Sequence, residues 1–247
     1  MSSVAANNPL RRAVHFLAPI PLFALAIAYF TGNLTINPIQ AATRLSGDIA
    51  IIFLLLTLAC SPVNTLFDVP RVLKLRRPLG LWTFYYASLH LLVNVGLDYR
   101  FDFRLFRLDN AGKPYILWGI LTITVLTALA LTSRKWWKKK LGKNWKNLHR
   151  LVYAAGATAV IHLALVVKGN LLNLQGDLWK PLTALAILIV LMVLRLPFVK
   201  AAITRSRQRR RAARGAKSAG SAPGELTHQP AVLTDDVQPL NIKPGLE

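Results

Sequence analysis

Six long apolar runs, separated by short basic stretches, constrain this chain more than any other feature. Spanning a hydrocarbon core takes roughly 20 apolar residues. Each run comes close to that length or exceeds it, and together they hold very few charges. The runs cover residues 13–30, 49–66, 79–97, 115–131, 148–167 and 178–199. The sequence therefore predicts an all-α, polytopic membrane protein, a six-helix transmembrane bundle that occupies residues 13–199.

Composition supports this fold class and excludes others. Hydrophobic residues make up 53% of the 247 residues, yet 31 Lys and Arg stand against 10 Asp and Glu. These basic residues lie in short loops and a tail, not on a soluble domain, so we do not interpret the charge as nucleic-acid binding. A single cysteine, Cys60, excludes an internal disulfide and any multi-cysteine zinc or iron–sulfur site.

The basic residues also predict the orientation of the bundle. Cytoplasmic loops of membrane proteins carry an excess of Lys and Arg. In this chain the excess lies before the first run, between the second and third runs, and between the fourth and fifth runs. We therefore expect these segments, the N-terminal residues 1–12 and the C-terminus to face the cytoplasm.

The C-terminal tail, residues 200–247, is basic in its first half and polar in its second. With almost no large apolar side chains it cannot build a core, so we expect a disordered cytoplasmic tail whose basic half lies on anionic membrane lipids. It is also too short for a flavin- or nicotinamide-binding domain, because one βαβ unit alone takes about 30 residues. Redox equivalents would therefore have to come from another molecule.

Two segments, residues 76–90 and 147–162, hold three of the five histidines. On ideal helices His90 lies about 16 Å and His162 about 22 Å from the inner end of its span, so the two lie at similar depth. A histidine alone in such a helix is explained by a hydrogen bond to a neighbouring helix. A depth-matched pair instead favours bis-histidine ligation of a haem iron, and we predict His90 and His162 as the ligands.

His149 allows two interpretations. It lies near the inner end of the fifth run, roughly 140° around an ideal helix from His162, so it is either a ligand of a second haem or a surface histidine among lipid headgroups. His15 enters the first run at the same level and is the only other intramembrane histidine that could pair with it. An interfacial position beside Arg11 and Arg12 explains His15 equally well.

Haem propionates need cations at the membrane edge. Arg76 and Arg77 open the third run and could bind a haem near the inner face, and Arg100, Arg104 or Lys168 could serve one nearer the outer face. Positive-inside topology and lipid phosphates explain the same residues. Within the third run, Tyr86 and Asn94 share a face with His90, where they would orient its ring, line a quinone pocket or bond a neighbouring helix.

Three parts of the chain together resemble a known family: RRPLGLWTFYYASLH, LGKNWKNLHRLVY and the His162 that follows. They are similar to the MsrQ (YedZ) family, the haem-binding membrane subunits of the bacterial MsrPQ methionine-sulfoxide reductase system, within the ferric-reductase-like transmembrane superfamily that includes the NADPH oxidases. The resemblance runs from about residue 15 to residue 199. It implies haem b, a further FMN cofactor, and a location in the bacterial inner membrane.

The resemblance also implies a role without catalysis by the chain itself. Electrons would pass from quinol or a cytoplasmic flavin reductase to a periplasmic molybdopterin-containing MsrP-like catalytic subunit that repairs oxidised methionine. His90 and His162 match the ligand pair of the family, and His149 matches its third motif histidine. NADPH oxidases carry two histidines in the equivalent of the third span, whereas this chain has only His90 there. A second haem therefore lacks an obvious ligand.

Two rival functions stand beside this one. The first is a self-contained transmembrane ferric or quinone reductase. The second is a proton-coupled transporter whose buried histidines relay protons, and transporters often contain internal repeats. The sequence shows no convincing repeat.

Overall fold

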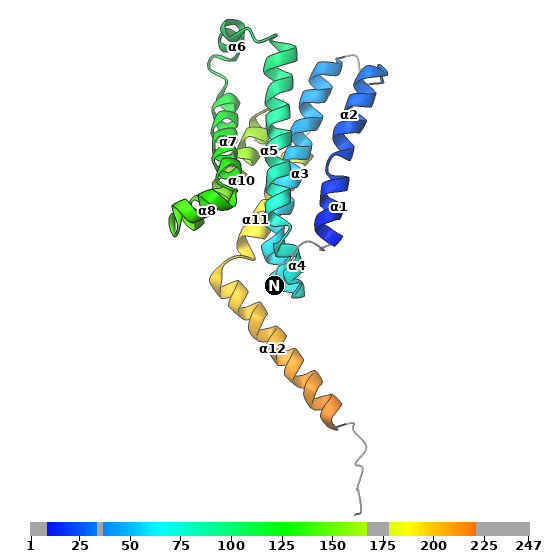
Figure 1. Ribbon diagram of the computed structural model, residues 1–247, viewed down its shortest axis with the longest axis vertical. Helices are drawn as coiled ribbons and strands as arrows, with labels where there is room; N and C mark the ends of the chain where they lie inside the picture. The colour runs from blue at the N-terminus through cyan, green and yellow to red at the C-terminus, as the bar shows by residue number, and fades with distance from the viewer. Residues whose placement is uncertain (1–8, 34–36, 167–177, 221–247) are drawn as a thin grey trace, which may run out of the picture. The chain divides into compact units, whose positions relative to one another are not determined.

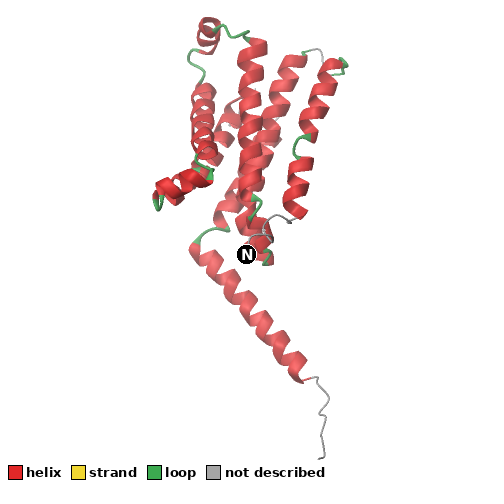
Figure 2. Cartoon of the chain, in the orientation of Figure 1, coloured by secondary structure: helices red, strands yellow, loops and turns green. Residues whose placement is uncertain are grey.

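The computed structural model describes residues 9–33, 37–166 and 178–220, and these form helices joined by turns, with no strand in the described ranges (Figures 1 and 2). The chain divides into two units, Met1–Arg205 and Ser206–Glu247. The all-α class predicted from the apolar runs is confirmed. Lys168, His228 and the end of the fifth predicted run at Val167 lie outside the described residues.

The first half of the bundle consists of three helical segments. The first is α1 (Pro9–Leu17) followed by α2 (Ile20–Phe30), which are separate because Pro19 and Pro21 remove backbone N–H donors at that point. The second is the long α3 (Pro38–Phe67). The third is α5 (Arg76–Leu92), which continues into the π-helix η1 (Val93–Asp98).

The second half contains α7 (Pro114–Leu131), then α9 (Asn144–Arg150) with α10 (Val152–Val166), and then α11 (Trp179–Val193). Short helices lie in the connections: α4 (Pro70–Leu73), α6 (Phe103–Asn110) and α8 (Lys135–Leu141). The last helix is α12 (Pro197–Gly220).

Six membrane spans are not confirmed. In the described residues four helical segments are long and apolar enough to cross a membrane: Pro9–Phe30, Pro38–Phe67, Pro114–Leu131 and Asn144–Val166. A fifth arises only if α11 and the start of α12, bent by 69°, count as one span. The third predicted run is helical, but its α-helix has 17 residues, begins with two arginines and then changes to π geometry.

Helix α3 is the centre of the packing. It packs most extensively against α5 and also contacts α10 and α11, while α7 packs against α10. Figure 1 shows α1 and α2 on one side of α3 and α5, with α7 and α10 on the other. A Cβ on Gly156 of α10 would lie 3.0 Å from Leu58 Cδ1 of α3, so the bare glycine allows these two helices to approach closely.

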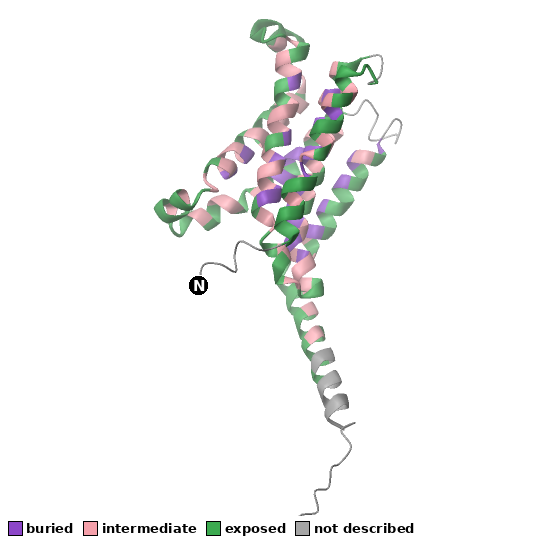
Figure 3. Cartoon of the chain, turned by 45° about the vertical axis from the view of Figure 1, so that its right-hand side comes forward, coloured by how far each residue is buried: buried purple, intermediate pink, exposed green. Residues whose placement is uncertain are grey.

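The bundle exposes many large apolar side chains on its outside, as Figure 3 shows by the exposed colouring of the outer helix surfaces. Phe16, Phe23, Ile52 and Leu117 are more than half exposed. The helices turn small and branched residues inward instead, in a cluster that contains Leu58, Val160, Ala184, Leu188 and Leu191. An apolar exterior around such a core is what a lipid environment requires.

The first part of the predicted tail, residues 200–220, is helical and forms most of α12. The segment is rich in Ala, Arg, Lys and Gln, which are strong helix formers, and no proline occurs between Pro197 and Pro223. A segment that cannot build a core can still form a helix when its backbone propensity is high and its length exceeds about 15 residues. The rest of the predicted tail, 221–247, lies outside the described residues.

Candidate functional site

His90, on α5, is held against the backbone of α3. Its Nδ1 lies 2.7 Å from the carbonyl oxygen of Thr43. A Cβ on Gly47 would come within 3.0 Å of the same Nδ1, so the ring lies directly on the glycine. Because a carbonyl only accepts, Nδ1 carries the proton and donates, which leaves Nε2 with a free lone pair.

His162, on α10, is held in the same way by α7. Its Nδ1 lies 2.7 Å from the carbonyl oxygen of Tyr115, and a Cβ on Gly119 would lie 3.0 Å from both Nδ1 and Cε1 of the ring. The Tyr115 ring lies beside the imidazole, with centroids 6.2 Å apart. Nε2 of this histidine is again the nitrogen with a free lone pair.

The carbonyl and glycine that contact His90 and those that contact His162 are spaced in the same way along the chain, a repeat that was not expected from the sequence. Each histidine bonds a carbonyl 47 residues earlier in the chain, and each glycine follows that carbonyl residue by four positions. Thr43 and Tyr115 contribute backbone atoms only, so their side chains could not reveal the match. The one sequence signal is the equal spacing from Gly47 to His90 and from Gly119 to His162.

The two rings meet in the interior of the bundle. The centroids of His90 and His162 are 6.2 Å apart and their planes are inclined by 86°. Imidazole nitrogens bond metal ions at about 2 Å, so two imidazoles on opposite sides of one ion place their ring centroids about 6 Å apart. Neither Nε2 has a hydrogen-bond partner in the described part of the chain. The pair therefore fits axial ligation of one iron.

The donor set also fits a haem rather than a metal ion bound by the protein alone. In the described residues no group of three or more His, Cys, Asp and Glu could hold a metal ion. Two axial imidazoles need the remaining ligands from elsewhere, and a porphyrin supplies four nitrogens in one plane. His90 and His162 would hold this group.

An ion pair lies next to the α3 residues that contact His90. Lys180 Nζ, at the start of α11, is 2.7 Å from Asp48 Oδ2 on α3, the residue after Gly47. The two side chains are 40% and 30% exposed, so water screens the pair in part. The contact joins the start of α11 to the α3 segment in which Thr43 and Gly47 contact the His90 ring.

Of the three roles considered for Tyr86, the structure shows the hydrogen bond to a neighbouring helical segment. It is buried, its hydroxyl donates to the Ala18 carbonyl at 2.6 Å, and its ring stacks on Phe53. Ala18 lies at the break between α1 and α2, where the prolines leave carbonyls without helical partners. Asn94, its counterpart beyond His90, lies in η1, and π-helical turns inside spans are frequent at functional sites.

His149 lies outside the histidine pair. Its ring stacks on Trp145 with centroids 4.0 Å apart, and its Nδ1 is 3.2 Å from the Trp145 carbonyl of the same helix. The turn at Leu151 separates α9 from α10, so the angle expected on an ideal helix does not apply. In the described residues no ring contact joins His149 to another histidine, and His15 is exposed on α1.

The basic residues at the end of the bundle that carries His149 differ in their surroundings. Arg76 is half-buried and interacts electrostatically with His149 and with Arg195, whereas Arg77 is exposed. Arg195, at the end of α11, donates to the Leu58 carbonyl of α3 and lies over the Tyr153 ring at 4.6 Å.

Arg195 was not among the residues expected from the sequence, although Pro62 gave a signal for it. Pro62 lies inside α3 and has no N–H for the carbonyl four residues earlier, which is that of Leu58. A lone arginine in an apolar run is a natural donor for a carbonyl freed in this way. The guanidinium of Arg195 makes this bond across the helix interface.

The fold and the histidine pair define a helical membrane protein of the ferric-reductase-like class, and residues 46–160 match the family described as "Ferric reductase like transmembrane component". The chain belongs, more narrowly, to the MsrQ family. It is 38% identical over 187 residues to the protein-methionine-sulfoxide reductase heme-binding subunit MsrQ of Rhodospirillum rubrum, which covers 75% of this chain and 86% of that protein.

Two further relatives carry the same name. The protein of Herminiimonas arsenicoxydans is 34% identical over 187 residues, 75% of this chain and 84% of the relative. The protein of Bordetella pertussis is 38% identical over 160 residues, 65% of this chain and 75% of the relative. The family resemblance expected from the three sequence motifs is therefore confirmed.

Proposed function

We propose that this chain is the haem b-binding, electron-transferring membrane subunit of a methionine-sulfoxide reductase, with His90 and His162 as the axial ligands. The observation that carries the proposal is the close pair of imidazoles, with ring centroids 6.2 Å apart, each with Nδ1 bonded to a carbonyl and Nε2 free. When bound, the haem supplies an iron that gains and loses one electron. The names of the relatives, heme-binding subunits, support the same cofactor.

The residues around the pair fix the two ligands before any cofactor binds. Each Nδ1–H bond selects the tautomer and increases the basicity of Nε2. Each glycine removes the side chain that would push the ring away from its carbonyl. The apolar helices around both rings exclude water and lower the local dielectric, which is one of the means by which a protein sets a haem potential.

The direction of electron flow follows from the proposed topology. We place both termini in the cytoplasm and the chain in a bacterial inner membrane, because the loops around 71–77 and 134–146 together carry 11 Lys and Arg and no acidic residue. Quinol or a cytoplasmic flavin reductase would donate electrons, with FMN as the second cofactor that the family resemblance implies. The acceptor would be a periplasmic molybdopterin-containing MsrP-like catalytic subunit.

The proposal needs one haem and assigns His149 to the cytoplasmic end. There Arg76 interacts electrostatically with His149, and Arg77 is the next residue along α5, so an imidazole and two guanidinium groups are available to an anionic cofactor. A second haem would need a further axial ligand, which no described histidine supplies by contact with His149.

The reduced absorption spectrum and the haem content of the purified protein test the site. We expect a b-type spectrum in the wild type, and its loss in His90→Ala and in His162→Ala. His149→Ala and the exposed control His15→Ala should keep the wild-type content. A wild type without haem, or full haem in both ligand variants, contradicts the proposal. A half loss in His149→Ala alone would establish a second haem.

The role as a subunit is tested by reconstitution. Vesicles that contain the chain, supplied with quinol, should support reduction of methionine sulfoxide only when the catalytic subunit of the same organism is added. His90→Ala should abolish this turnover. Rapid reduction of ferric citrate by the chain alone would instead favour the self-contained ferric reductase.

A further inference from the structure

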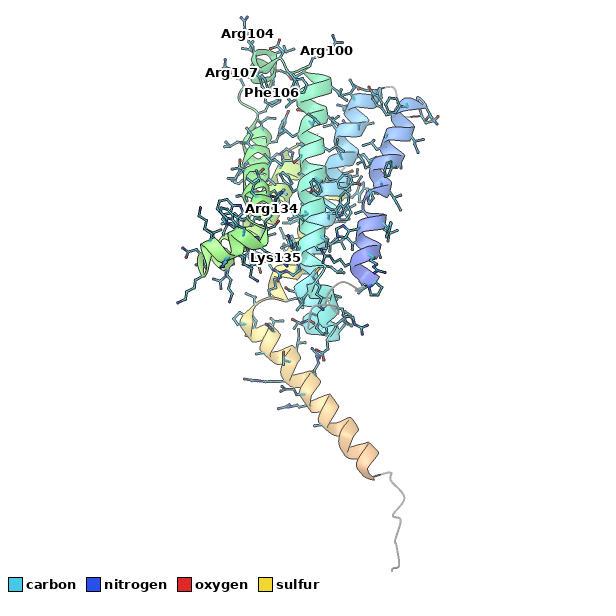
Figure 4. All side chains as sticks on the ribbon, in the orientation of Figure 1. Arg100, Arg104, Phe106, Arg107, Arg134 and Lys135 are labelled. Atoms are coloured by element: carbon cyan, nitrogen blue, oxygen red, sulfur yellow. The ribbon has the colours of Figure 1, made fainter. Side chains whose placement is uncertain are left out.

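Helix α6 (Phe103–Asn110) lies in the connection between η1 and α7 and presents a row of arginines at one end of the bundle. Figure 4 shows Arg100, Arg104 and Arg107 there, at the opposite end from Arg134 and Lys135. All three arginines are exposed. None of them forms an ion pair with any residue in the part of the chain that the structure describes.

The neighbouring carboxylates are already engaged. Asp102 caps the start of α6 by accepting from Leu105 N at 2.9 Å. Asp109 accepts from the Tyr99 hydroxyl at 2.5 Å and pairs with Lys113 at 3.4 Å. Asp98, at the end of η1, acts electrostatically on the same tyrosine. The charge that α6 presents outward is therefore that of the arginines.

Exposed apolar side chains alternate with these arginines. Phe103 is 68% exposed, Leu105 52% and Leu108 65%. Arg104 and Leu108 are neighbours one turn apart on the helix. On an ideal helix Arg104 and Arg107 share one face of α6, and the exposed Phe103 and Leu108 flank them. Arginine beside exposed aromatic and aliphatic groups is characteristic of the centres of protein interfaces.

The helix is attached to the bundle through contacts with Tyr99. The Phe106 ring packs edge-on against Tyr99 with centroids 5.1 Å apart, and Asn110 Nδ2 donates to the Tyr99 hydroxyl at 3.1 Å. The turn before α6 places Arg100 and Phe101 in left-handed conformations, with φ of 49° and 61°. Residues other than glycine rarely adopt these backbone angles unless the surroundings impose them, and such strained segments concentrate at functional sites.

One residue joins α6 to the histidine pair. The Tyr115 backbone carbonyl accepts from His162 Nδ1, and the Tyr115 hydroxyl donates to Asn110 Oδ1 of α6 at 3.4 Å. A protein docked on α6 would therefore lie at the outer end of a contact chain that begins at a proposed haem ligand. An electron acceptor requires this proximity, and a lipid surface does not.

We infer that α6 and the turn before it, with Arg100, Arg104 and Arg107 as the charged contacts, form the docking surface for an acidic face of the catalytic partner subunit. The inference rests on the proposed function, because only an electron-transfer subunit needs such a partner. Arginines that project from a fixed helix steer an acidic protein to the surface and accelerate its association.

The test compares two triple variants of the full chain in lipid nanodiscs. One variant is Arg100→Gln/Arg104→Gln/Arg107→Gln. The other, matched in charge change at the opposite end, is Arg134→Gln/Lys135→Gln/Lys139→Gln. The probe is the soluble methionine-sulfoxide reductase catalytic subunit of the same organism, and biolayer interferometry at several salt concentrations gives the association rate and Kd. We expect the α6 variant to bind at least tenfold more weakly, mainly through slower association, with a weaker dependence on salt. The control should bind like the wild type.

Haem content of each variant is measured in the same samples, so that the proposed function and the docking surface can fail separately. Wild-type affinity in the α6 variant, or an equal loss in the control variant, overturns the docking surface even when haem is intact. A lipid-facing α6 also overturns it. In that case a fluorophore on Leu108→Cys, in a Cys60→Ser background, is quenched by headgroup nitroxide lipids and stays quenched when the catalytic subunit is added.

Discussion

The imidazole rings of His90 and His162 meet with centroids 6.2 Å apart, although each is fixed by a different helix pair, α3 with α5 and α7 with α10. The spacing of the rings depends on how closely each helix pair packs. In both pairs that approach is set at a glycine, Gly47 or Gly119, where the ring touches bare backbone. The site is thus as sensitive to a methyl group on the facing helix as to the histidines themselves.

Gly47→Ala and Gly119→Ala should each displace a proposed haem ligand. The added Cβ would lie 3.0 Å from a ring nitrogen, which is tighter than ordinary contact, so the ring or the helix must move. Overpacking of this kind costs about 1–3 kcal/mol of stability. We expect a lower haem content and a shifted Soret band in the purified variants.

Gly80→Ala is the matched control for these two glycines. Its Cβ would lie 3.7 Å from Thr57 Cγ2, an ordinary contact, and alanine favours the helix by up to about 1 kcal/mol over glycine. We expect wild-type haem content and equal or greater thermal stability. Unchanged spectra in all three variants would show that the glycines do not position the rings.

Tyr86→Phe should loosen α1 and α2 from the bundle. The substitution removes the hydroxyl that satisfies the Ala18 carbonyl, and a buried acceptor left without a partner costs about 1–3 kcal/mol. Hydrogen–deuterium exchange should rise in α1 and α2 before it rises in α3. Tyr85→Phe is the control, because Tyr85 is 54% exposed and its hydroxyl makes no bond in the described residues. Equal exchange in both variants would remove the role assigned to Tyr86.

Arg195→Met should destabilise the interface between α11 and α3. It removes a charged hydrogen bond to the Leu58 carbonyl, about 1.5–3 kcal/mol, together with the contact on Tyr153. In a Pro62→Ala background residue 62 regains an N–H that can bond the same carbonyl within α3. The cost of Arg195→Met should therefore be smaller in that background. Unfolding midpoints of the four proteins in this double-mutant cycle test it, and an equal cost in both backgrounds would rule out the carbonyl as the reason.

The attachment of α6 should depend on pH at both extremes. The hydrogen bond from Tyr99 and the charge of Lys113 lower the pKa of Asp109 below its ordinary 3.8, so its stabilisation is complete above that value and is lost as the pH falls through the lowered pKa. Burial, followed by the bond to Asp109, raises the pKa of Tyr99 above its ordinary 10.0, so its stabilisation is complete below 10.0 and is lost as the pH rises through the raised pKa.

A spin label on Leu105→Cys, in a Cys60→Ser background, reports this attachment. Its spectrum should stay constant from about pH 4 to about pH 10 and become more mobile outside that window. Asp109→Asn should remove the acid change, because no carboxylate remains to be protonated. An acid change of the same size in Asp109→Asn would assign it to another group.

Several features could be predicted from the sequence because they depend on local pattern. The length of the apolar runs predicted helices in a membrane, and the break between α1 and α2 lies where Pro19 and Pro21 lack N–H groups. The rise per residue of a helix predicted that His90 and His162 lie at similar depth, and in the structure their ring centroids are 6.2 Å apart. Helix propensity, which is also local, accounts for the helix over residues 200–220.

Other features depend on which helices pack together, and no local pattern encodes that. Thr43 and Tyr115 accept the histidine hydrogen bonds through their backbone carbonyls, so their side chains give no sequence signal of these bonds. The bond from Arg195 to Leu58 joins residues 137 positions apart. No ring contact in the described residues joins His149 to another histidine, and its role as a ligand of a second haem stays a prediction.

The sequence by itself determined the membrane-helix class and predicted a similar depth for the two histidines, since these follow from hydropathy and from the fixed rise of a helix. Only the tertiary structure decided that their rings lie 6.2 Å apart, that each donates Nδ1–H to a carbonyl beside a glycine, and that α6 is joined to one of them through Tyr115. The reason is physical. Rotation and approach of neighbouring helices are set by side-chain packing over the whole interface, and a change of one methyl group can alter them.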